Sequence, residues 1–195
     1  LLFTPIINYG GGVDASQRFV FDYNQILSGG NFKTDLTFDS NFENKNNNKW
    51  LSDASIISKY NKNINKNFRI QIDSALQTSK NYIQRTKPND ELSYKNSLST
   101  DIVLEGYNLN KLDDYLEISS NFYQTNQENI DNKTLPIVLP KIKYFSGYFY
   151  NNQNISNSTY EFYNIAREKS NLVHAQRQQK FSHTYNIKRE LIKYN

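Results

Sequence analysis

The chain has 195 residues, of which 37% are hydrophobic and 14% aromatic, and its formal net charge is +4. The low mean hydropathy of -0.78 resembles that of a chain in water, but 15 Tyr and 12 Phe are too many large rings for a disordered segment. The mild positive charge does not call for nucleic acid, and the absence of Cys excludes disulfides and thiolate metal sites. No apolar run reaches the length of about 18 residues that a membrane-spanning helix needs.

Alternating apolar and polar side chains begin near the N-terminus. Residues 19–23 place Phe and Tyr on one parity, and the Gly pair at residues 29–30 signals a tight hairpin turn. Residues 32–42 then alternate strictly. Because successive side chains of a strand point to opposite faces, this segment predicts a strand with one apolar and one polar face.

The same pattern continues through the middle of the chain. Residues 50–60 alternate, although Leu51 and Ile57 depart from the pattern, and residues 68–76 form another clean amphipathic strand. A long polar stretch at residues 77–95 then interrupts the alternation. We expect a connection there and no further element.

Further strands are expected at residues 98–104 and 116–122, followed by an apolar run at residues 135–150 that contains Pro136 and Pro140. Since proline lacks the donor that a ladder needs, we expect a strand irregularity at these prolines.

The last two candidates are residues 159–165 and 181–191. In total the sequence predicts roughly eight or nine strands of about ten residues, in an all-β, antiparallel up-and-down meander without crossover helices.

Strand length separates the three architectures that fit such a meander: a soluble barrel, a β-sandwich and a membrane barrel. Strands of soluble proteins are mostly about five to six residues long, whereas a tilted strand that crosses a bilayer needs about nine to eleven. We therefore expect part of an outer-membrane β-barrel wall. The sequence contains no Met and opens on a strand-like segment, so we expect residues 1–195 to be a single partial domain of a longer chain.

The two parities supply candidate residues for the two sides of that wall. The candidate luminal residues are Lys33, Asp35, Asp39, Arg69, Asp73, Asp101, Glu105 and Glu117. The candidate lipid-facing residues are Phe32, Leu36, Phe38, Phe68, Ile70 and Ile72. The polar set could guide a phosphorylated glycolipid, although charges of this kind more often solvate a face or pair across strands.

Several short segments occur in an order that resembles one known family. They are YIQR at residues 82–85, LEGY at 104–107, FYQ at 122–124 and LPIVLPKIKY at 135–144. Together they are similar to the lipopolysaccharide-assembly protein LptD, or organic solvent tolerance protein, family in the version typical of alphaproteobacteria. The loops here are unusually rich in Asn and Lys, and the N-terminal periplasmic domain of that family is absent from this sequence.

The resemblance implies a protein of the cell outer membrane that inserts lipopolysaccharide into the outer leaflet. Its implied partners are lipopolysaccharide, outer-membrane lipid, a plug lipoprotein like LptE and a periplasmic bridge like LptA. Sugars and phosphates would pass through a polar lumen while the acyl chains leave sideways between weakly paired strands.

Other functions remain open: another outer-membrane barrel such as a porin or receptor, or a soluble β-sandwich that binds ligands as an adhesin or lectin does. We expect no enzymatic activity and no cofactor, because adjacent Ser182 and His183 would point to opposite faces of a strand. We also expect no metal site, because His174 and His183 have no paired spacing.

Overall fold

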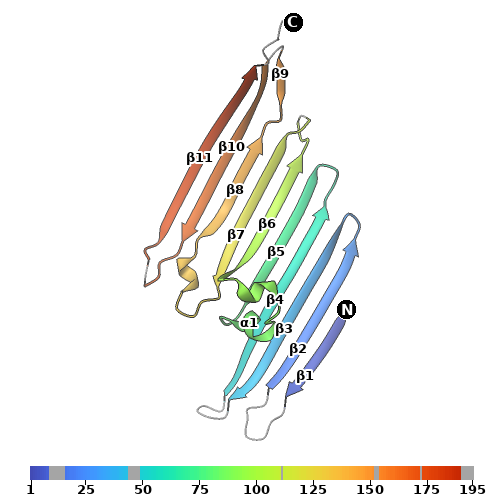
Figure 1. Ribbon diagram of the computed structural model, residues 1–195, viewed down its shortest axis with the longest axis vertical. Coiled ribbons are helices and arrows are strands. Elements are labelled where there is room, and N and C mark those ends of the chain that lie inside the picture. Colours follow the sequence, from blue (N-terminus) through green and yellow to red (C-terminus); the bar gives the residue numbers. More distant parts are fainter. Residues whose placement is uncertain (9–15, 44–48, 111, 152–153, 172, 190–195) are drawn as a thin grey trace.

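A computed structural model describes residues 1–8, 16–43, 49–110, 112–151, 154–171 and 173–189 of the chain. In this part, all strands belong to one antiparallel sheet in which neighbours in sequence are also neighbours in space (Figure 1). The expected all-β meander is therefore confirmed. The sheet is not closed, since β1 and β11 lie at its two opposite edges, and its form is compatible with part of a barrel wall.

The sheet has eleven strands, more than the eight or nine that alternation predicts. They are β1 Leu2–Asn8, β2 Ser16–Leu27, β3 Gly30–Glu43, β4 Lys49–Asn63, β5 Phe68–Gln77, β6 Ser97–Tyr107, β7 Tyr115–Thr125, β8 Ile137–Phe145, β9 Phe149–Asn151, β10 Asn154–Arg167 and β11 Gln176–Arg189. Three short helices accompany them: α1 Tyr82–Thr86 and the 3-10 helices η1 Glu91–Tyr94 and η2 Asn132–Thr134. Both α1 and η1 lie in the connection between β5 and β6, where the sequence suggested no element.

The strands are long. β3 has 14 residues and β4 has 15, so that at a rise of about 3.3 Å per residue β3 extends over about 46 Å. Nine of the eleven strands have nine or more residues and so reach the length that a tilted crossing of a bilayer requires. The two shorter strands are β1 and β9.

The β2–β3 hairpin turns at Ser28 and Gly29, as the sequence suggests. Gly29 has a φ of 78°, in the left-handed region that favours glycine. At Gly30 the backbone of Asn61 on β4 comes so close that a Cβ atom would overlap its carbonyl oxygen. Two glycines are thus needed for two different reasons, one for the turn and one for the close approach of the next strand.

β8 contains an extra residue. Leu139 and Pro140 together lie opposite the single residue Asn164 of β10, and the register of β8 with β7 shifts at the same place. The side-chain amide of Asn164 donates a hydrogen bond to the carbonyl oxygen of Leu139, which satisfies an acceptor at the bulge. Pro136 lies just before β8, after η2.

The buried side chains of the described residues are mostly polar. Among the described residues, the buried hydrophobic ones are Ala75, Tyr82, Ile83 and Leu98. The buried polar or charged ones are Thr37, Asp39, Ser55, Gln77, Ser93, Asp114, Ser119, Thr125, Asn126, Ser146 and Asn164. This balance is the reverse of that in an ordinary soluble domain, in which the apolar side chains are the buried ones.

Candidate functional site

The strand register places all eight candidate luminal residues on one face of the sheet, which we call the polar face. One transverse row on this face joins Lys33, Lys59, Asp73 and Asp101 across β3 to β6. A second row joins Arg69, Glu105, Glu117, Lys143 and Glu161 across β5 to β10. The face therefore carries both signs of charge on neighbouring strands.

A bidentate ion pair on the polar face joins Arg18 of β2 to Asp39 of β3. The guanidinium donates two hydrogen bonds, from Nε to Oδ1 at 2.7 Å and from Nη2 to Oδ2 at 2.8 Å. The Asp39 side chain is only 10% exposed. A bidentate, charge-assisted pair of this kind fixes the register of β2 and β3 as well as the two charges.

Several other charges on this face form ion pairs at longer distances, and Asp101 is held by hydrogen bonds. The ion pairs are Lys59 Nζ to Asp73 Oδ1 at 4.0 Å, Arg69 Nη1 to Glu105 Oε2 at 3.9 Å, Lys141 Nζ to Glu117 Oε1 at 3.2 Å, and Lys143 Nζ to Glu161 Oε1 at 3.7 Å. Asp101 instead accepts hydrogen bonds from Asn121 Nδ2 at 2.6 Å and Ser99 Oγ at 2.8 Å.

Sequence reasoning missed the basic partners of these carboxylates: Arg18, Lys59, Lys141 and Lys143. Each lies on the polar parity of its own strand, but its partner is on another strand and the pairing becomes visible only once the register is known.

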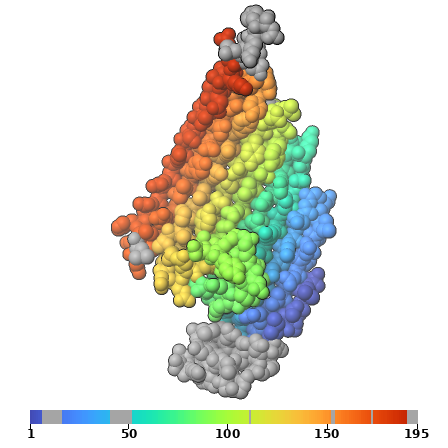
Figure 2. Space-filling model, in the orientation of Figure 1, coloured from blue at the N-terminus to red at the C-terminus, as the bar shows by residue number. Residues whose placement is uncertain are grey.

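The connection between β5 and β6, residues 78–96, folds back over the polar face, and we call it the insert. Figure 2 shows it in green as a mound on the face turned toward the viewer. Ile83 of the insert packs with Ala75 and Leu98, and the cluster also contacts Ile57 and Leu92. Ile57, one of the two residues that depart from the alternation of β4, thus lies on the polar face because it packs against the insert. The side chain of Leu51 lies outside the described residues.

Polar contacts tie the insert to several strands. Lys87 forms an ion pair with Asp35 of β3, and Arg85 Nη2 lies 3.3 Å from Asp53 Oδ2 of β4. At the end of β5, Gln77 accepts a hydrogen bond from the backbone N–H of Ile83 at 2.9 Å.

Gln77 also connects β5 with β7. Its side chain donates to Asn126 Oδ1 at 2.7 Å, and its backbone N–H donates to Gln124 Oε1 at 2.9 Å. Pairing of β5 with β6 ends before this point, so the side chain of Gln124 takes the place of a β6 backbone partner. In the same region, beyond the pairing of β6 with β5, Leu98 is fully buried in the cluster with Ala75 and Ile83.

Tyr82 of α1 is buried beside the Arg18–Asp39 pair. Burial, together with the nearby Asp39 carboxylate, raises the pKa of the Tyr82 hydroxyl above its usual value near 10. The insert therefore reaches across the face as far as β2 and β3, with its phenol held in the neutral form.

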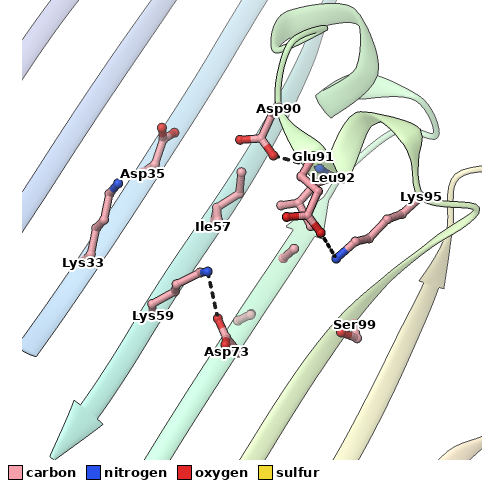
Figure 3. Close-up of a pocket in the computed structure, with 12 residues that line it drawn as sticks. Lys33, Asp35, Ile57, Lys59, Asp73, Asp90, Glu91, Leu92, Lys95 and Ser99 are labelled. Atoms are coloured by element: carbon pink, nitrogen blue, oxygen red, sulfur yellow. Dashed lines mark hydrogen bonds and ion pairs between the residues drawn. The ribbon is translucent and has the colours of Figure 1, made fainter.

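A cavity of about 380 Å³ lies between the insert and the polar face (Figure 3). Its sheet side carries Lys33, Asp35, Lys59 and Asp73, and its insert side carries Asp90, Glu91 and Lys95. Within it, Lys95 pairs with Glu91 at 3.3 Å and Lys59 with Asp73. The charges around the cavity nearly balance, and Ile57, Ala75 and Leu92 line the rest of it, so that its wall is part charged and part apolar.

The opposite face, which we call the apolar face, carries all six candidate lipid-facing residues. Nothing in the described part of the chain covers it: Leu36 is 41% and Phe38 39% exposed. Aromatic rings form two rows across the N-terminal strands. Phe3, Phe19 and Phe38 stack with centroids 6.0 and 6.4 Å apart, and Tyr23, Phe32 and Tyr60 meet at 5.9 and 6.2 Å.

Hydroxyl groups on the apolar face are paired with one another. Thr34 Oγ1 and Ser58 Oγ are 2.7 Å apart, and Ser74 Oγ and Thr100 Oγ1 are 2.9 Å apart. These pairs satisfy polar groups that would otherwise cost free energy in an apolar environment.

No protein-family model, curated protein or solved structure matches the chain.

The geometry also places the residues that were considered for catalysis and metal binding. Ser182 lies opposite Glu161, on the polar face, whereas His183 stacks on Tyr160 of the apolar face with ring centroids 4.4 Å apart. The two side chains thus lie on opposite faces of β11. The described residues include no group of three or more acidic or His side chains placed to hold a metal ion, and no helix long and apolar enough to cross a membrane.

Proposed function

We propose that this chain forms part of the wall of an outer-membrane β-barrel, with its apolar face toward lipid and its polar face toward an aqueous lumen. The observation that carries the proposal is the contrast between the faces of one sheet of long strands. An uncovered apolar face backs a face whose charges are paired across strands, and this is the arrangement expected of a barrel wall in a bilayer.

The two aromatic rows fit inside the apolar band of a membrane barrel. Phe38 and Phe32 are six residues apart on β3, which corresponds to about 20 Å along the strand. For a strand tilted by about 40°, this distance is about 15 Å along the membrane normal, less than the apolar band of about 25 Å. The rows therefore add ring surface to the apolar face and do not mark the two borders of the band.

A soluble β-sandwich is the alternative that this geometry disfavours. In a sandwich, Phe32, Phe38, Phe68 and Ile70 would be buried between two stacked sheets. The described residues form a single sheet, and Phe38 on it is exposed.

The connections suggest which end of the wall faces outward. β2–β3 and β4–β5 are joined by short turns, whereas β5–β6 and β7–β8 have long connections at the opposite end of the sheet (Figure 1). Outer-membrane barrels have short periplasmic turns and longer external loops. The insert would therefore lie at the external end.

Within this class we propose lipopolysaccharide insertion as the specific function. Support comes from the ordered segments that resemble the LptD family, which lie in α1, at the end of β6, in β7 and through β8. The polar face would give sugars and phosphates a path, and a plug lipoprotein and a periplasmic bridge would be the partners. This specific proposal rests on the resemblance, and the barrel proposal does not depend on it.

The barrel proposal and the lipopolysaccharide proposal are tested by separate measurements. The full chain, produced in a Gram-negative host, is expected in the outer-membrane fraction, with slower gel mobility after heating, as is typical of folded barrels. Recovery as a soluble protein would contradict the barrel proposal. Depleting the protein from its own cells is expected to stop newly made lipopolysaccharide from reaching the surface; unchanged surface lipopolysaccharide would contradict the specific proposal alone.

A further inference from the structure

The insert lies where it would restrict a lumen. It projects from the polar face near one end of the sheet, over β3, β4 and β5 (Figures 1 and 2). In a barrel wall oriented as proposed above, this side is the interior. The insert would thus occupy part of the cross-section of the lumen.

Its anchors are spread over several strands. The Ile83 cluster fixes it to β4, β5 and β6, while Lys87 and Arg85 reach β3 and β4. Tyr82 extends the contact to the Arg18–Asp39 pair that joins β2 and β3. A segment that swings on a hinge would be attached on one side, whereas releasing this insert requires an apolar cluster and several polar contacts to break together.

The insert also contains the main apolar cluster of the described chain. Ile83 is 0% exposed, and three of the four buried hydrophobic residues belong to this cluster. Burial of an apolar side chain of this size stabilises the docked position of the insert. The position of the insert is therefore an energetically specified feature and not a loosely held loop.

Between the insert and the sheet, the cavity of about 380 Å³ is lined in part by charged side chains. Lys33 and Lys59 on the sheet side lie across from Asp90 and Glu91 on the insert side (Figure 3). Charges of both signs suit hydrated ions and small polar solutes, and the volume matches that of a small ligand and not of an oligosaccharide.

We propose that residues 78–96 form a fixed constriction of the lumen that admits ions and small polar solutes and excludes larger saccharides. This inference rests on the proposed barrel. It adds that a bulky glycolipid would have to pass the wall elsewhere than beneath the insert.

The test uses the full chain in planar bilayers and in vesicles loaded with a neutral oligosaccharide. Because β5 and β6 are hairpin neighbours, residues 80–95 can be replaced by a short Gly-Ser turn. A second variant, Ile83→Asp, undocks the insert without shortening the chain. Both variants are expected to raise conductance by ~3-fold or more and to release the oligosaccharide, because a narrow opening limits flow.

Ile64→Asp is the matched control. Ile64 is 56% exposed in the β4–β5 turn at the other end of the sheet, so the same substitution there is expected to leave conductance unchanged. If both insert variants form heat-modifiable barrels with unchanged conductance and no release, the constriction is overturned while the barrel proposal stands. If the unmodified chain does not enter membranes, the barrel proposal itself fails.

A covalent link between the insert and the sheet distinguishes a fixed constriction from a moving lid. The chain has no Cys, so Asp35→Cys combined with Lys87→Cys provides two thiols that a short, cleavable bifunctional thiol reagent can join, in place of the Lys87–Asp35 ion pair between the insert and β3. Conductance is expected to be equal with the link formed and cleaved. Lower conductance only with the link formed would show that the insert opens, and would overturn its assignment as fixed.

Discussion

The polar and apolar faces belong to the same strands, yet they differ in what their side chains contact. On the polar face, carboxylates meet Arg and Lys across strands and the insert packs over them. On the apolar face, rings and aliphatic side chains contact one another but no described element covers them. The difference teaches that the environment completes this fold: the polar face carries its own partners, and the apolar face requires a surrounding apolar medium.

The largest expected effect comes from a charge on the apolar face. Leu36→Arg places a guanidinium near the middle of β3 and is expected to lower the free energy of unfolding in lipid vesicles by about 2–4 kcal/mol. The measurement is denaturant unfolding in vesicles. Asn31→Arg, on the polar parity of the same strand, is the matched control and is expected to change stability by less than about 0.5 kcal/mol. Equal losses in the two variants would show that the faces do not differ as described.

A smaller effect is expected from ion pairs on the polar face. Arg18→Ala leaves Asp39, which is 10% exposed, without its bidentate partner, and should cost about 2 kcal/mol. Lys59→Ala removes the partner of Asp73 from an exposed pair 4.0 Å apart and should cost less than about 0.5 kcal/mol. Thermal unfolding of both variants in detergent checks the order. A larger loss for Lys59→Ala than for Arg18→Ala would contradict it.

The smallest effect concerns pH and the docking of the insert. Because the pKa of Tyr82 is raised in the folded protein, the folded state keeps this proton after the phenol of an undocked insert has begun to ionise. The stabilisation is present below about pH 10 and is lost as the pH rises above it. Proteolysis of the insert is therefore expected to accelerate above about pH 10, and less so in Tyr82→Phe. The same alkaline acceleration in both proteins would exclude this role of Tyr82.

Most of the sheet could be predicted because its signal is local. The alternation of residues 32–42 and 68–76 assigns faces without any knowledge of neighbouring strands, and the register places the polar candidates on one face and the apolar candidates on the other. β9, with three residues, is too short to show a pattern.

The insert could not be predicted because its stability is not local. Tyr82, Ile83 and Leu92 are few apolar residues in a polar stretch, and the surface they need comes from β4, β5 and β6. One signal was available: Ile57 departs from the alternation of its strand. An apolar side chain on a polar parity indicates that something covers it, although its partner could not be named from the sequence.

The bulge in β8 has a consequence for how the strands find their alignment. In a long amphipathic meander, shifting the register of a strand by two residues keeps every side chain on its proper face. The face pattern alone therefore hardly disfavours such a shift. Pro140 has no N–H for a regular ladder position, and only Asn164 supplies an amide to the carbonyl of Leu139. The bulge therefore favours one alignment of β8 with β10, because a shift by two residues would leave Pro140 at a regular ladder position and the carbonyl of Leu139 without the Asn164 amide.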